Sequence, residues 1–154
     1  MNESVSSPFG VPVVTQIGLV VKDIHRSVEN YAAIFGLEKP EVIITDTFEM
    51  AKTNYRGQPS YAQAKLAFFN FGQVQIELIE PIGEPSTWKE VLEEKGEGVH
   101  HIAFQVKGTD QVVSYLEDKG IPLVQQGHYT GGMYSYLDGS DRLGVVLELL
   151  ENFE

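Results

Sequence analysis

Two carboxylates, one imidazole and one amide stand out in this sequence because each interrupts a segment that is otherwise apolar and rich in β-branched residues. They are Gln16, Glu77, His101 and Glu148. A carboxylate within a buried strand is costly unless a partner compensates its charge. Two glutamate oxygens, an imidazole nitrogen and an amide oxygen suit a divalent cation, and without thiolates such a set favours Ni, Co, Mn, Fe(II) or Zn. The residue types therefore indicate a metal centre with positions left open for water or substrate.

An internal repeat in the sequence predicts that these four residues lie close together in the fold. The segment 16–22 aligns without a gap on 101–107, and 76–80 aligns on 147–151. Self-similarity of this kind is typical of a duplicated structural unit. The four polar residues fall at matching places in the two halves, although their separations along the chain fit no local motif. We therefore expect the metal centre to depend on the repeat.

Alternation of side chains along the strands assigns the four residues to one face. Gln16 shares its face with Gly18, and His101 shares its face with Ala103. These small residues are expected to leave open volume beside the site. The two glutamates lie on the same face, while their apolar neighbours point the other way, beneath the helices. His100 is assigned to the face opposite His101.

Each of these residues also has a purely structural interpretation, and alternation alone does not decide between the two. Gln16 could satisfy backbone groups at the start of a strand, and His101 could be a buried structural histidine. The two glutamates could lie on a solvated face of an open sheet. Tyr134 and Tyr136 share a face and either line the cup or pack in the core, and residues 128–132 either rim a pocket or form a plain turn.

The elements that must position the site follow the order strand, helix and three strands, twice over. N-cap residues and glycine stops predict helices over 23–36, 86–96 and 110–119. β-Branched and alternating segments predict strands at 15–21, 65–69, 73–79, 99–106, 121–125, 133–137 and 143–150. Residues 46–61 show no period and are expected as a long loop or a ragged hairpin. Helices covering one face of mostly antiparallel strands define an α+β protein.

Composition narrows the class of protein. The chain has 154 residues, of which 42% are hydrophobic and 21% charged, as in one globular domain of ordinary size. We expect residues 1–10 to be a flexible tail and residues 11–152 a single domain. A formal charge of −11 argues against nucleic acid or an anionic membrane as partner. Without cysteine, a secretory signal or an apolar run of about 20 residues, a soluble, cytoplasmic protein is expected.

Four blocks of the sequence resemble the vicinal oxygen chelate (VOC) superfamily, which includes glyoxalase I, methylmalonyl-CoA epimerase, extradiol dioxygenases and bleomycin-resistance proteins. They are residues 15–31, 74–81, 96–104 and 144–149. The resemblance implies two paired βαβββ modules, at about 13–81 and 98–151, that form a cupped mixed sheet around one divalent metal ion such as Co, Ni, Zn or Mn. Carried over by motif, the metal ligands fall on Gln16, Glu77, His101 and Glu148.

The blocks Gly96–Ile102 and Glu77–Pro81 are most similar to the methylmalonyl-CoA epimerase branch. Two departures matter. Epimerases usually have histidine where this chain has Gln16, and a glutamine there is similar to eukaryotic glyoxalase I. Some epimerases also carry a second catalytic glutamate on the strand before that of Glu77, and residues 64–69 hold no acid here. By analogy with the family, Glu148 is expected as the catalytic base and Glu77 as the second candidate.

The resemblance thus implies a metal-dependent isomerase or epimerase that moves a proton next to a carbonyl, with an acyl-CoA or another thioester or carbonyl compound as substrate. The alternatives are a glyoxalase I-like lactoylglutathione lyase, favoured by Gln16, and a non-catalytic protein that binds a small molecule. An extradiol dioxygenase is disfavoured because such enzymes usually use two histidines and one carboxylate. A homodimer is also implied, since many relatives complete their cup across a two-fold axis.

Overall fold

The computed structural model describes residues 7–153 and confirms the α+β class. Its strands form one mixed sheet of ten strands in the order β2-β5-β6-β1-β7-β10-β9-β8-β3-β4. In chain order the elements are β1 (Gln16–Val20), α1 (Ile24–Phe35), β2 (Ile43–Ile44), α2 (Phe48–Ala51), β3 (Asn54–Tyr55), β4 (Gln58–Pro59), β5 (Gln63–Phe71), β6 (Val74–Ile82), α3 (Thr87–Lys95), β7 (Gly98–Gln105), α4 (Thr109–Asp118), β8 (Leu123–Tyr129), β9 (Gly132–Leu137), α5 (Ser140–Leu143) and β10 (Val146–Asn152).

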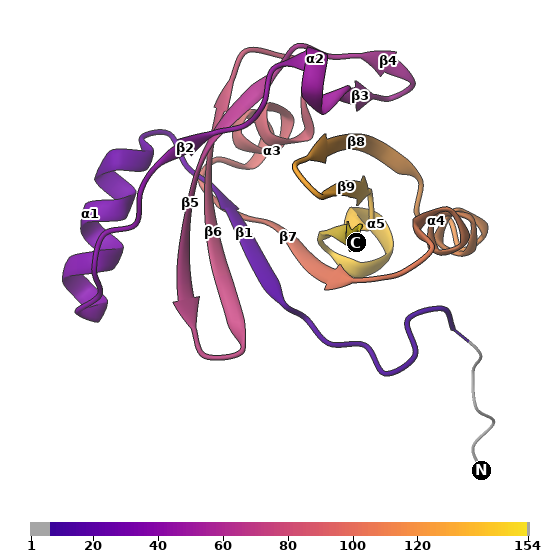
Figure 1. Cartoon of the computed structure of the whole chain (residues 1–154), viewed down its shortest axis with the longest axis horizontal. Helices are drawn as coiled ribbons and strands as arrows, with labels where there is room; N and C mark the ends of the chain where they lie inside the picture. Colours follow the sequence, from indigo (N-terminus) through magenta and orange to yellow (C-terminus); the bar gives the residue numbers. More distant parts are fainter. Residues whose placement is uncertain (1–6, 154) are drawn as a thin grey trace.

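The two halves of the sheet share one strand order. In each half the first strand lies parallel to the last, β1 beside β6 and β7 beside β10, and antiparallel neighbours follow outward. Strands β1 and β7 join the halves in antiparallel pairing at the centre. The sheet curls, and α1 and α4 lie outside opposite halves (Figure 1). This is the cupped mixed sheet that the resemblance implies.

Each outer helix buries an apolar stripe against its own half of the sheet. Under α1 the buried residues are Val21, Ile24, Val28, Ala32, Ala67, Phe69 and Leu78. Under α4 they are Val112, Val113, Leu116, Ile121, Leu137, Leu147 and Leu149. Burying one aliphatic side chain of this size contributes about 1.5–3 kcal/mol. The convex face of the sheet is thereby covered, and the polar residues of the same strands are left on the concave face.

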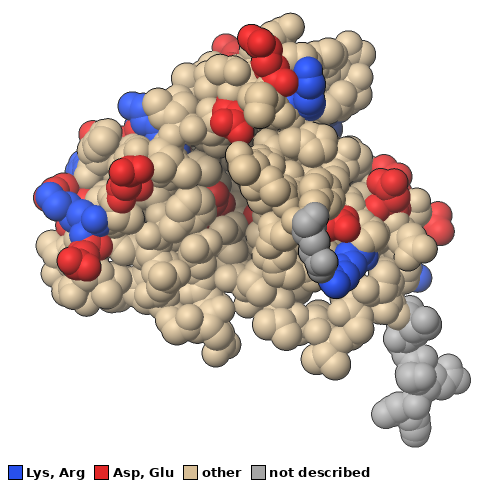
Figure 2. Space-filling model, in the orientation of Figure 1, with Lys and Arg blue, Asp and Glu red and all other residues tan. Residues whose placement is uncertain are grey.

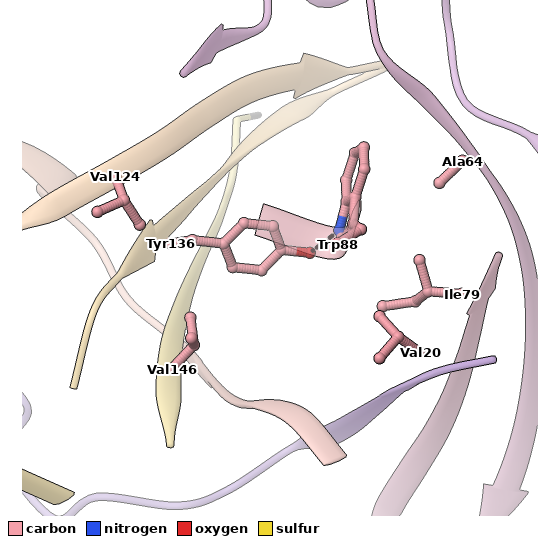
Figure 3. Packing of buried hydrophobic residues seen from close by; sticks show 7 residues of the cluster. All are labelled: Val20, Ala64, Ile79, Trp88, Val124, Tyr136 and Val146. Carbon is pink, nitrogen blue, oxygen red and sulfur yellow. Dashed lines mark hydrogen bonds between the residues drawn. The ribbon is translucent and has the colours of Figure 1, made fainter. Parts of the chain in front are cut away.

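A third apolar cluster draws residues from both halves on the concave side. It consists of Val20, Ala64, Ile79, Trp88, Val124, Tyr136 and Val146. Figure 3 shows the Trp88 indole directed toward the Tyr136 hydroxyl, with Val20 and Ile79 on one side and Val124 and Val146 on the other. The indole Nε1 donates a hydrogen bond to this hydroxyl at 3.0 Å. The cluster fixes the two halves against each other beside the predicted site.

The first and second predicted helices begin and end where their caps indicate. The Asp23 carboxylate accepts a hydrogen bond from the Arg26 amide, and α1 stops at Gly36, whose φ of 68° is the left-handed conformation that glycine favours. The Ser86 hydroxyl accepts from the Lys89 amide at the start of α3. The third helix, α4, also forms and is shifted by one residue from its predicted start.

For residues 46–61 the structure confirms the hairpin alternative and adds a short helix. This segment forms the short helix α2 and the hairpin β3–β4, and β3 pairs with β8 to complete one edge of the sheet. Arg56 and Gly57 turn the hairpin with φ angles of 50° and 85°, as a two-residue hairpin loop requires. Strands of two residues are stable only through their partners, and such partners are not visible in a local pattern.

Two predicted strands have wrong boundaries. The strand expected at 121–125 is β8, which continues through Gly127, a residue typical of turns. A Cβ on Gly127 would lie 2.6 Å from the Tyr134 ring, so glycine here allows close packing within the sheet. The strand expected at 143–150 begins only at Val146, because the residues before it form the short helix α5.

Of the expected N-terminal tail, residues 1–6 lie outside the described residues. Phe9 packs edge to face on Phe104, with ring centroids 5.3 Å apart. Across residues 7–153, no helix combines the length and the apolar character needed to cross a bilayer.

Candidate metal centre

The four residues singled out in the sequence lie together on the concave face. His101 Nε2 is 3.0 Å from Glu148 Oε1 and 3.3 Å from Glu77 Oε1. The Gln16 side-chain oxygen lies 3.0 Å from the same nitrogen. One ligand atom from each of Glu77, His101 and Glu148 falls within 4.8 Å of the others, so the three residues could hold a metal ion. All four side chains are buried, and His101 is fully excluded from solvent.

The strand pairing accounts for this convergence. Gly18 of β1 lies opposite His101 of β7, and parallel pairing places Gly18 beside Glu77 of β6 on its other side. On the far side of β7, Glu148 of β10 pairs with Ala103. The four central strands therefore present the four side chains to one point.

The sequence predicted that Gly18 would leave open volume beside the site, and this is wrong. The His101 ring fills that space, because a Cβ on Gly18 would lie 2.1 Å from its Cε1 atom. Only glycine allows the imidazole to lie this close to β1. The position is therefore a steric requirement of the site.

The converging atoms are acceptors, which fits a cation. With the Gln16 oxygen directed inward, it faces Glu77 Oε1 at 3.1 Å and Glu148 Oε1 at 2.9 Å, as well as His101 Nε2. Such close acceptors repel one another unless a proton or a cation lies between them. Rotating the amide by half a turn would let its nitrogen donate to both carboxylates instead. Two carboxylates, an imidazole and an amide oxygen also match the ligand chemistry of Zn, Co, Ni or Mn.

Burial and mutual charge shift the acidities of these groups. Burial alone would lower the pKa of His101, but the charges and hydrogen bonds of Glu148 and Glu77 raise it to about 10. Burial raises the pKa of Glu77, and the nearby Glu148 charge adds to this. Without metal, the cluster therefore retains at least one proton at neutral pH.

Because the metal-free cluster retains a proton, its affinity for a metal ion is expected to depend on pH. A ligating His101 must be deprotonated at Nε2, so metal binding has to displace its proton. Because the His101 pKa in the metal-free protein is about 10, the proton competes at all lower pH values. The apparent affinity for Zn²⁺ is expected to rise about tenfold per pH unit between pH 6.5 and 8.5. Calorimetry in two buffers of different ionisation enthalpy should show release of about one proton per ion. A pH-independent affinity without proton release would contradict the assignment.

The prediction for His100 is wrong. Alternation assigned it to the opposite face, but the register between β1 and β7 shifts at this point, so that Leu19 pairs with Val99. The resulting β-bulge turns two consecutive histidines to the same side. His100 Nδ1 lies 2.8 Å from His101 Nδ1, and its side chain is buried. Burial and the neighbouring His101 charge lower the pKa of His100 well below its usual value, which favours a neutral ring.

A cavity of about 480 Å³ opens beside the cluster, and Gln16, Glu77 and Glu148 form part of its lining. Figure 2 shows a hollow between the two halves on this face, surrounded mostly by uncharged side chains. Tyr134 and Tyr136 line the cavity, and Tyr136 also packs in the third apolar cluster, so both interpretations hold for it. Residues 128–130 lie at the cavity wall.

Sequence reasoning missed part of this cavity lining. It assigned no role in the pocket to Trp88, Ile43, Ile44, Thr53 or Phe68. In the structure both side chains of the two-residue strand β2 are exposed and do not serve the core, and this exposure could not be predicted from the sequence. Such residues are typical of the wall of a binding site.

The fold and the cluster define a class of α+β proteins in which two halves of one strand order curve around a set of potential metal ligands. Residues 15–136 match the family model described as the Glyoxalase/Bleomycin resistance protein/Dioxygenase superfamily. The chain therefore belongs to this superfamily.

The similar proteins include a relative found by sequence and solved structures of methylmalonyl-CoA epimerases. Uncharacterized protein YqjC of Bacillus subtilis (strain 168) is 31% identical over 139 residues, which cover 88% of this chain and 89% of that protein. A methylmalonyl-CoA epimerase solved with methylmalonyl-CoA and NH4+ is similar with a TM-score of 0.62 and 26% identity, covering 92% of this chain and 94% of that one. A Streptomyces coelicolor methylmalonyl-CoA epimerase variant with 2-nitronate-propionyl-CoA gives 0.61 and 27%, covering 91% and 94%. The chain is thus structurally like epimerases that bind acyl-CoA ligands.

Proposed function

We propose that this protein is a metal-dependent isomerase or epimerase that transfers a proton at a carbon next to a carbonyl. The observation that carries the proposal is the convergence of four buried potential ligands, Gln16, Glu77, His101 and Glu148, beside a cavity large enough for a small substrate. Similarity to methylmalonyl-CoA epimerases at 26–27% identity supports the reaction class.

The four side chains would have the following roles in the reaction. A divalent ion held by the four side chains would stabilise negative charge on the carbonyl oxygen as the α-proton leaves. The Glu148 carboxylate takes that proton, and the electron pair of the C–H bond moves toward the carbonyl oxygen. Return of the proton to the same carbon from the other side gives epimerisation, and return to the neighbouring carbon gives isomerisation. Glu77 is the second candidate for the base.

The cavity restricts which part of a substrate enters it. Its acidic and imidazole lining groups are Asp46, Glu77, Glu148 and His128, and no lysine or arginine lines it among residues 7–153. The phosphates of an acyl-CoA would therefore lie outside, and only the acyl and thioester part would enter. A small acyl group, or another compact carbonyl compound with an apolar body, fits the aromatic and aliphatic wall.

A glyoxalase I-like lyase is the second candidate, because of Gln16. An amide at this ligand position is similar to eukaryotic glyoxalase I, and here it lies 3.0 Å from His101 Nε2. The reaction would move a proton between neighbouring carbons of the hemithioacetal formed by glutathione and methylglyoxal. Assays with methylmalonyl-CoA and with this hemithioacetal separate the two candidates.

Metal content is the first test of the proposed function. We expect one divalent ion per chain by elemental analysis after loading with Co²⁺, Ni²⁺ or Zn²⁺ and gel filtration. Because the folded state alone assembles the four ligands, loading should also raise Tm, by an amount that grows with the logarithm of free metal. A protein that retains no ion under these conditions is instead a non-catalytic binding protein. Light scattering tests the implied homodimer in the same sample.

A further inference from the structure

The two neutral ligands of the cluster each have a second polar atom that faces away from it. For His101 this atom is Nδ1, which lies 2.8 Å from His100 Nδ1. For Gln16 it is the amide nitrogen, which donates to Gln75 Oε1 at 2.8 Å. We propose that His100 and Gln75 are positioning residues that determine which atom of His101 and of Gln16 faces the metal ion. This proposal rests on the metal centre, but not on the reaction.

The geometry around His100 fixes the tautomer of both rings. If His101 binds the ion through Nε2, its Nδ1 carries the hydrogen and donates it to His100 Nδ1. His100 must then carry its own hydrogen on Nε2, and this atom lies 3.0 Å from the Thr87 hydroxyl oxygen. The three side chains are almost fully buried, so water cannot replace these bonds. A chain of two hydrogen bonds thus runs from α3 through the β-bulge to the metal ligand.

The Gln75 amide controls Gln16 in a similar way. The two residues lie side by side on the parallel strands β6 and β1. While Gln75 presents its oxygen, the Gln16 nitrogen is engaged and the Gln16 oxygen faces the cluster. If the Gln16 amide is turned, its oxygen faces Gln75 Oε1 at 2.8 Å, so Gln75 has to turn as well. The two amides therefore favour the metal-binding orientation together or lose it together.

Outer partners of this kind usually change metal affinity by about 10–100-fold when removed. We expect His100→Phe, which keeps a ring without an acceptor, to weaken Zn²⁺ binding by about 10–100-fold in a competition titration with a chromophoric chelator. His100→Asn, which places an amide oxygen near the former Nδ1, is expected to remain within about threefold of the wild-type Kd. Thr87→Val should give a smaller loss, of about three- to tenfold, and keeps the test available if the phenylalanine variant does not fold.

The absorption spectrum of bound Co²⁺ supplies a readout that a purely structural role would not move. At saturating Co²⁺ the visible bands of His100→Phe should shift, because the imidazole is no longer fixed, while His100→Asn should keep the wild-type bands. Equal affinities of wild type and His100→Phe, or equal losses in the phenylalanine and asparagine variants, would overturn the role of His100. If the wild-type protein itself binds no metal, the proposed function fails together with this inference.

The matching test for Gln75 uses an acceptor and a non-acceptor. Gln75→Leu frees the Gln16 amide to turn and should weaken Zn²⁺ binding by about tenfold. Gln75→Glu keeps an oxygen acceptor for the Gln16 nitrogen and should bind Zn²⁺ at least as tightly as wild type. Gln73→Glu, in the exposed turn just before the same strand, controls for the added charge. Wild-type affinity in Gln75→Leu, or a loss in Gln75→Glu that matches the leucine variant, would overturn the role of Gln75.

Discussion

Replacing Glu148 with glutamine is expected to lower the exchange of substrate α-protons with solvent by about 10²–10⁴-fold. The glutamine retains the shape of the side chain and an oxygen toward the cluster, but an amide cannot take a proton. The measurement is deuterium incorporation from D₂O into methylmalonyl-CoA, and into the hemithioacetal of methylglyoxal and glutathione, followed by mass spectrometry. Metal content is determined in the same sample, so that loss of the base is distinguished from loss of the ion.

Two further variants serve as a comparison and as a control for this prediction. Glu77→Gln should retain more exchange than Glu148→Gln at saturating metal if Glu148 is the base. Glu49→Gln, an exposed residue of the short helix α2, should exchange like wild type and controls for the lost charge. Normal exchange in metal-loaded Glu148→Gln would show that another group takes the proton, and the order of the two glutamates would then be reversed or abandoned.

The face of each of the four candidate ligands could be predicted because alternation in a strand is a local property. Glu77 and Glu148 lie between leucines or isoleucines that the helices bury, so one residue of shift would have exposed the apolar set. The duplicated strand order then followed from the repeat. The N-caps and C-terminal stops of the helices could be predicted for the same reason, because they too are local, as Asp23 and Gly36 show.

The failures have a common physical cause, namely dependence on a partner. His100 is turned inward by a β-bulge, which exists only in the pairing of β7 with β1. The pairing of the hairpin β3–β4 with β8, a strand far along the chain, was not predicted. Nothing in the spacing of Trp88 indicates that its indole reaches a tyrosine of the other half. Features that depend on a long-range pairing and that the repeat does not mark are therefore the ones that could not be predicted.

Gly18→Ala is expected to destabilise the protein by about 1–3 kcal/mol or more and to abolish metal binding, because the added methyl group overlaps the buried His101 ring. For a chain of this size such a loss lowers Tm by roughly 2–12 °C. Gly36→Ala is a matched control in open space, where only the left-handed φ of 68° opposes the change. It should cost about 1 kcal/mol and leave Zn²⁺ stoichiometry unchanged.

The double variant Gly18→Ala/His101→Ala makes the steric explanation decisive. Once the ring is gone, the methyl group at position 18 has room, and alanine is intrinsically better than glycine within a strand by about 0.5–1 kcal/mol. The same Gly18→Ala change should therefore destabilise the wild type and stabilise the His101→Ala background, when each free energy of unfolding is measured by urea titration. A cost that is equal in both backgrounds would show that the glycine serves the backbone of β1 and not the imidazole above it. In that case the close packing of His101 on β1 would not be what requires glycine at this position.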